Sequence, residues 1–201
     1  AVLRPPGTTV IARNRAFHRM LADGVRVETK GKDGRVRGDI ARLFDLDKPR
    51  KGNDWLAVNQ FTVERIGPNG GTRRPDIVLF INGLPLAMVE VKDPADPTAT
   101  VMTAFDQFRT YIDQIPEAFD HNEILIVTDG TETSMGTITS GFSRFAAWKT
   151  IDGRKEHAGA GQMETMVRGA LTPARVLDLV QAFVAFEDGE KQVEKKIAAY
   201  H

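Results

Sequence analysis

The stretch from Arg73 to Lys92, RRPDIVLFINGLPLAMVEVK, decides the fold expected for this chain. Two apolar runs of strand length flank the dipeptide Asn82-Gly83, which is typical of a tight β-hairpin turn. Acidic residues stand where a plain core strand has none: Asp76 opens the first run, and Glu90 lies near the end of the second. A charge in an apolar run is costly unless it is paired or bound to a metal. The pattern therefore predicts a hairpin that carries a functional site.

The length of the turn determines whether the two acids can meet. Side chains alternate along a strand, so Glu90 and Lys92 share one face. With two residues in the turn, Asp76 would lie opposite Val89 and point away from Glu90. A three-residue loop with a left-handed glycine would place Asp76 opposite Met88, diagonal to Glu90 on the same face. A shared site therefore requires an odd loop or a β-bulge.

Two carboxylates and a lysine in this pattern fit metal-assisted hydrolysis of a phosphodiester. Carboxylates on adjacent strands, here Asp76 and Glu90, can hold Mg²⁺ or Mn²⁺, with the backbone carbonyl of Val91 as a third ligand. Such a metal polarises the phosphate and lowers the pKa of a bound water. Lys92 can orient that water or offset the charge that develops in the transition state.

Pro75-Asp76, the apolar interval and Glu90-Val91-Lys92 together resemble the motif of the PD-(D/E)xK nuclease superfamily. Their surroundings resemble the N-terminal nuclease region of the R subunit, the restriction and motor subunit, of type I restriction–modification enzymes. The resemblance extends from about Asn14 to the end of the chain. The stretches that carry it are Asn59–Val63, Arg73–Phe80, Asn82–Leu86, Ala104–Gln107, Thr110-Tyr111, Thr128–Gly130, Trp148–Thr150 and Ala199–His201.

This resemblance implies a Mg²⁺-dependent DNA endonuclease domain in which Asp76, Glu90 and Lys92 are catalytic. Many nucleases of this kind carry a Gln-x3-Tyr pattern on the helix after the catalytic strand. Gln107 and Tyr111 match it, since residues four apart project together from a helix. The resemblance implies that this pair supports the site or contacts DNA.

The resemblance also implies partners that lie outside this chain. In the family, the nuclease region is followed by a DNA-translocating ATPase motor, and methyltransferase and specificity subunits complete the complex. Double-stranded DNA is then cut far from the recognition site after ATP-driven translocation, so ATP acts only through the motor. We expect a cytoplasmic prokaryotic enzyme, and a fragment of a longer R subunit that stops about where the motor would begin.

Composition and charge are compatible with this interpretation. The 201 residues include no cysteine, and no apolar run is long enough for a membrane span. Residues 1–75 hold 16 Lys/Arg against 8 Asp/Glu, and residues 76–201 hold 11 against 19. The asymmetry reflects either solvated charges that happen to segregate or a basic face that follows phosphates. Arg73, Arg74 and the loop Lys48–Lys51 are the candidates for contact with the DNA backbone.

The remaining patterns predict an α/β domain with a mixed, twisted sheet flanked by helices. We expect a PD-(D/E)xK restriction-endonuclease-like core over residues 1–151 and a helical extension over residues 152–201. Asn14 and Thr98 are the predicted caps of the first two helices. The expected helices are 14–21, 98–115, 162–169, 173–186 and 189–200, and the expected strands besides the hairpin are 25–29, 36–44, 55–66, 123–128 and 145–150.

Two alternatives to a nuclease remain. One is a non-catalytic DNA-binding or subunit-assembly module on a nuclease-like fold. An active site that no longer catalyses a reaction usually lacks one of its residues, however, and this set of residues is complete. The other is a metal hydrolase that acts on small phosphoesters. The sequence offers this second alternative neither a compact substrate-binding motif nor a cluster of histidine ligands.

Overall fold

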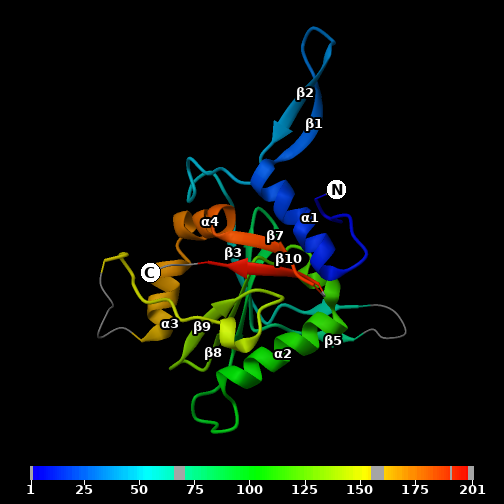
Figure 1. The fold of residues 1–201 in the computed structure, drawn as a ribbon. Coiled ribbons are helices and arrows are strands. Elements are labelled where there is room, and N and C mark those ends of the chain that lie inside the picture. Colours follow the sequence, from blue (N-terminus) through cyan, green and yellow to red (C-terminus); the bar gives the residue numbers. More distant parts are fainter. Residues whose placement is uncertain (1, 66–70, 155–160, 191, 199–201) are drawn as a thin grey trace.

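The computed structural model describes residues 2–65, 71–154, 161–190 and 192–198, and a mixed sheet lies at its centre (Figure 1). The strands of this sheet lie in the order β3-β6-β7-β8-β9, and β7 and β8 are parallel while the other neighbours are antiparallel. The expected mixed α/β architecture is confirmed. These strands are β3 (Trp55–Asn59), β6 (Ile77–Ile81), β7 (Leu84–Val91), β8 (Ile124–Thr128) and β9 (Thr133–Gly136).

The hairpin of β6 and β7 combines a two-residue turn with a β-bulge in β7. Asn82 and Gly83 form a two-residue turn with positive φ at both positions, 51° and 80°, as a type I′ turn requires. The register shifts directly after Leu79, so that Leu86 is an extra residue on β7. Of the two arrangements that would place both acids on one face, an odd loop or a β-bulge, the structure has the bulge. Leu86 and Ala87 are both buried in the same core cluster, which accounts for the position of the bulge.

Helices cover both faces of the sheet. Helix α2 (Val101–Gln114) packs on one face, where Val78 and Met88 belong to its core cluster. Helices α1 (Val10–Asp23) and α4 (Pro173–Ala182) contribute to the cluster on the other face. That larger cluster includes Phe17, Leu21, Ile81, Val89, Ile126, Met166, Val176, Leu177 and Val180.

Both predicted helix caps are wrong by a few residues. Thr9 caps α1, accepting a hydrogen bond from the backbone nitrogen of Ala12 at 3.2 Å, and Asn14 lies buried inside that helix. Thr100 rather than Thr98 caps α2, in a reciprocal capping box with Thr103.

The strand expected over residues 25–29 is present and extends to Lys30, whereas the next two expected strands are shorter than predicted. β1 (Val25–Lys30) and β2 (Val36–Ala41) form a ribbon that projects from the body of the domain (Figure 1), and β2 ends before the expected Phe44. The single buried strand expected over residues 55–66 is wrong. β3 ends at Asn59 and is an exposed edge strand, and β4 (Val63–Glu64) pairs separately with β5 (Thr72–Arg73). Ile66 lies outside the described residues.

The segment after residue 151 is only partly helical. Helix α3 (Gln162–Thr165) continues into a π-helical turn, η3 (Met166–Ala170), and α4 ends at Ala182. The helix predicted near 189–200 is wrong, because β10 (Val184–Asp188) and β11 (Val193–Ile197) form an antiparallel hairpin. Burial alternates along both strands, and Val184 and Lys195 are their buried residues. The domain boundary at residue 151 stays a prediction, and both sides of it share the larger core cluster.

Short elements complete the fold. The 3₁₀ turns η1 (Pro116–Phe119) and η2 (Phe142–Arg144) follow α2 and β9 respectively. The strand predicted over residues 145–150 is wrong, since Ala146 makes only an isolated bridge to Met135. Within the described residues, no helix combines the length and the apolar character that crossing a membrane requires.

Candidate active site

Strand pairing brings Asp76 and Glu90 together. The register pairs Ile77 with Val89, so the residues directly outside this pair, Asp76 and Glu90, lie across from each other. Glu90 is in phase with Met88, which lies in the core cluster on the α2 face of the sheet. The β-bulge therefore meets the requirement that the two acids share one face.

Both carboxylate oxygens of Asp76 accept hydrogen bonds. Oδ2 accepts from the backbone nitrogen of Val91 at 2.8 Å, and Oδ1 accepts from Nε2 of Gln60 at 2.7 Å. The first bond comes from the strand that carries Glu90. The direction of the Asp76 carboxylate is thus fixed by its neighbours on both sides.

Glu90 is a buried acid with an incomplete set of partners. Its side chain is almost fully buried, at 2% exposed, and Oε1 lies 3.2 Å from Nζ of Lys92. Oε2 has no hydrogen-bond partner among the residues that the structure describes. Burial, and secondarily the negative charge of Asp76, raises the pKa of Glu90 from 4.5 to about 7, while Lys92 opposes the rise.

Lys92 connects Glu90 to helix α2. Its Nζ donates to Oε1 of Gln107 at 2.5 Å as well as to Glu90. Gln107 in turn donates from Nε2 to the hydroxyl of Tyr111. Burial raises the pKa of the Tyr111 hydroxyl above its ordinary value. The structure thus joins the Gln-x3-Tyr pair to the acids through one lysine.

The predicted DNA-contacting residues lie at two ends of the hairpin. Arg73 is half-buried and donates to Oε1 of Gln114 and to the carbonyl of Thr72, whereas Arg74 is exposed. Both arginines lie shortly before Asp76 in the chain, with Pro75 between Arg74 and Asp76. The loop Lys48–Lys51 is near the Asn82 turn, because Asn53 beside this loop bonds to Asn82. It therefore lies at the opposite end of β6 and β7 from the paired acids.

The donor set fits a hard divalent cation. Two carboxylates on one face, one with a buried oxygen that lacks a partner, match the oxygen ligands that Mg²⁺ prefers. In the described part of the chain, no group of three or more His, Cys, Asp or Glu side chains could hold a metal. A site here would therefore be completed by backbone oxygen or water, and the Val91 carbonyl stays the predicted third ligand.

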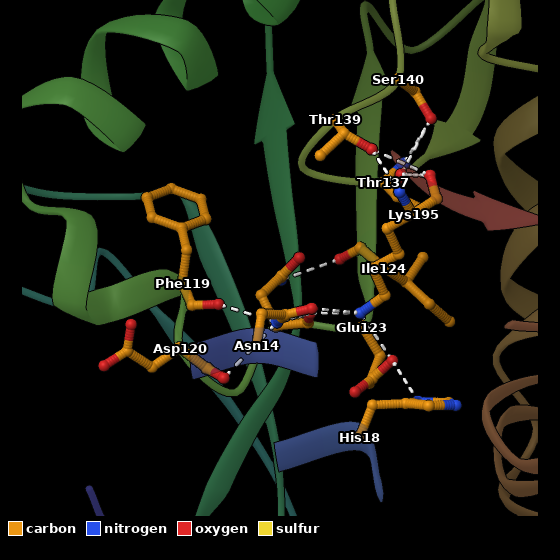
Figure 2. A network of polar contacts seen from close by, with 11 residues as sticks. Asn14, His18, Phe119, Asp120, Glu123, Ile124, Thr137, Thr139, Ser140 and Lys195 are labelled. Atoms are coloured by element: carbon orange, nitrogen blue, oxygen red, sulfur yellow. Dashed lines mark hydrogen bonds and ion pairs between the residues drawn. The ribbon is translucent and has the colours of Figure 1, made fainter. Parts of the chain in front are cut away.

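A second polar cluster, absent from the predictions, lies at the other end of β7 and β8 (Figure 2). Lys195 on β11 is fully buried, and its Nζ lies 2.6 Å from Oε2 of Glu123, which directly precedes β8. The same nitrogen donates to Oδ1 of Asn14 and to the carbonyl of Asn122, while His18 contacts Glu123 at 3.2 Å. This cluster fastens the C-terminal hairpin to α1 and the sheet.

Gln60 makes the other contact that the sequence did not predict, a hydrogen bond to Asp76. It belongs to the stretch Asn59–Val63 that carries the family resemblance, but no role was predicted for it. The signal that could have identified Gln60 is its position directly after β3, the strand that pairs with β6 beside Asp76.

The fold and the paired acids define a mixed α/β domain with a candidate two-carboxylate site, and comparisons with known proteins identify its family. The sequence profile described as "Type I restriction enzyme R protein N terminus" matches residues 3–144. The chain belongs to this family.

Two curated relatives are similar to the chain. The type I restriction enzyme HindI endonuclease subunit of Haemophilus influenzae is 38% identical over 196 residues, which cover 96% of this chain and 18% of the relative. The putative type I restriction enzyme MjaIXP endonuclease subunit of Methanocaldococcus jannaschii is 39% identical over 140 residues, which cover 70% of this chain and 13% of the relative. The chain thus spans less than a fifth of either relative.

Proposed function

We propose that this chain is the metal-dependent DNA endonuclease domain of a type I restriction enzyme R subunit, with a PD-(D/E)xK core. The observation that carries the proposal is the placement of Asp76 and Glu90 on one sheet face beside Lys92. Membership of the R protein family and the names of two relatives, both endonuclease subunits, support it. Its substrate is double-stranded DNA.

Each residue of the site has a distinct task in this proposal. Asp76 and Glu90 would hold Mg²⁺, which when bound supplies charge that polarises a phosphate and acidifies water. Lys92 places a positive charge beside Glu90, where it offsets the charge that develops on the scissile phosphate.

Residues around the acids hold the lysine and the substrate. Gln107 accepts a hydrogen bond from Lys92 and thereby holds its ammonium toward the acids, and Tyr111 in turn accepts from Gln107. Arg74, exposed two residues before Asp76, contacts the DNA backbone, while Arg73 contributes positive charge from its half-buried position.

The chain alone is expected to be a poor nuclease. Its formal net charge is zero, so long-range attraction to DNA is weak. In the proposal, the methyltransferase and specificity subunits select the DNA, and an ATP-driven motor region brings it to the site. The relatives are several times longer than this chain, which leaves room for such regions in proteins of this family.

The experiment uses plasmid DNA that carries a recognition site, with the full-length R subunit in its assembled complex. We expect cleavage that requires both Mg²⁺ and ATP. Glu90→Ala should abolish cleavage while ATP hydrolysis continues, which controls for folding and assembly. Cleavage by the Glu90→Ala complex at the unaltered rate would refute the proposed site.

The isolated chain provides a second comparison. We expect it to nick plasmid only at high protein and low salt, and only without EDTA. Fast cutting by the chain alone without ATP would instead indicate a self-sufficient nuclease.

A further inference from the structure

Gln60 lies beside Asp76 because of the way β3 pairs with β6. The register places Asn59 opposite Ile77, so Gln60, the residue directly after β3, reaches the level of Asp76. The backbone nitrogen of Gln60 donates to the carbonyl of Asp76 at 2.7 Å. Its side-chain amide donates to Oδ1 of the same residue, also at 2.7 Å.

The backbone of Gln60 adopts an unfavourable conformation to make these contacts. Its φ of 52° lies in the left-handed region, where Asn82 is the only other non-glycine residue in the described part of the chain. Asparagine tolerates this region better than glutamine does. Strained conformations persist only where the surrounding contacts hold them. Here the contacts that accompany the strain are the two hydrogen bonds to Asp76.

Gln60 and Val91 clamp the Asp76 carboxylate from two strands. The Val91 amide holds Oδ2 from β7, and the Gln60 amide holds Oδ1 from the end of β3. Both donors are neutral. They can fix the direction of a carboxylate without adding a positive charge that would repel a divalent cation.

We propose that Gln60 is a positioning residue, which orients the Asp76 carboxylate for a divalent cation shared with Glu90. This inference rests on the proposed function, since it assumes a cation at the paired acids. Hydrogen-bond partners of ligating carboxylates commonly affect metal affinity by about ten-fold or more. Gln60 should therefore act on affinity through Asp76.

The test measures Mn²⁺ affinity of the chain by isothermal titration calorimetry and thermal stability of the metal-free chain. Gln60→Gly removes the side-chain amide, keeps the backbone donor and relieves the positive φ. We expect its Mn²⁺ affinity to fall about ten-fold while its melting temperature stays the same or rises. Gln60→Asn, which tolerates the left-handed region but has a shorter side chain, should lose affinity in the same way. Thr62→Ala, an exposed change two residues along the same loop, should match the unaltered chain in both measurements.

Asp76→Asn and Glu90→Gln separate this inference from the proposed function. If either variant binds Mn²⁺ as tightly as the unaltered chain does, the cation site itself is wrong and the role of Gln60 fails with it. If both variants lose affinity but Gln60→Gly and Gln60→Asn retain it, the cation site stands and the positioning role is overturned. If neither Gln60 variant folds, Gln60 is required for the stability of the fold, and the inferred role in metal affinity is overturned.

Discussion

The backbone amide of Val91 donates a hydrogen bond to the Asp76 carboxylate at 2.8 Å, and this contact ties one acid to the strand that carries the other. Strand pairing and a β-bulge, rather than flexible side chains, thus hold Asp76 beside Glu90. Without a cation the protein keeps two acids close together, one of them almost fully buried. This arrangement has consequences for stability that can be measured without DNA.

Glu90 should make the metal-free chain less stable as pH rises. Its pKa is raised to about 7 in the folded chain by burial and by Asp76, so folding favours the protonated form. The resulting cost is absent below about pH 4.5, grows as pH rises, and is complete above about pH 7. It amounts to at most about 3 to 4 kcal/mol, since one pKa unit corresponds to about 1.4 kcal/mol.

Glu90→Gln should remove this cost. We expect the variant to be more stable than the unaltered chain at pH 8, with a difference that shrinks toward pH 5. Urea unfolding in EDTA across this range measures the difference, and comparing the two proteins cancels the titration of all other groups. A difference that does not grow with pH would contradict the burial of a charged Glu90. Added Mg²⁺ should stabilise the unaltered chain at pH 8 but not the variant.

Substitutions of Lys92 and Arg74 should have different effects: the first on the rate of DNA cleavage, the second on the affinity for DNA. Lys92→Ala should abolish cleavage by the full complex and leave the affinity for non-specific DNA nearly unchanged, because Lys92 is mostly buried against Glu90 and Gln107. Arg74→Ala should lower that affinity and reduce the dependence of log affinity on log salt by about one unit. Equilibrium binding at several salt concentrations, paired with cleavage assays, gives both readouts. Wild-type cleavage by Lys92→Ala would rule out the role assigned to this lysine.

Neighbouring lysines on β11 should differ sharply in their effect on stability. Lys195→Met leaves the Glu123 carboxylate buried without its cation, a change that costs roughly 3–5 kcal/mol. Lys196 is about half exposed, and its pairs with Glu187 and Glu194 are on the surface, so Lys196→Met should change stability little. Urea unfolding of the two variants provides the comparison. Equal losses would show that the buried pair does not hold the C-terminal hairpin in place.

Local signals in the sequence predicted the parts of the fold that depend on neighbouring residues. Asn82-Gly83 specified the tight turn, and the apolar runs on either side formed strands as expected. The predicted position of Gln107 and Tyr111 on one helix face was also confirmed. The odd residue that places the two acids on one face was also expected, in either an odd loop or a bulge, and the structure has the bulge. The odd residue became a bulge because Leu86 and Ala87 both enter one core cluster, and such packing depends on distant residues.

Contacts between distant segments account for what the sequence did not predict. From the sequence, Lys195 is expected on the surface, since lysine is seldom buried without a partner. Its partners come from α1 and from the residues before β8, and neither is evident from the local pattern of β11. Gln60 was missed for the same reason. Its contact with Asp76 follows from strand pairing and from a positive φ that glutamine rarely adopts.

The most direct test of the shared cation site is an anomalous difference map from crystals of this chain that contain Mn²⁺. We expect one strong peak within coordination distance of both the Asp76 and Glu90 carboxylates, and no such peak in crystals of Glu90→Gln. Crystals at a saturating Mn²⁺ concentration whose anomalous map has no peak between these carboxylates, or has peaks only elsewhere, would contradict the proposed metal-dependent site.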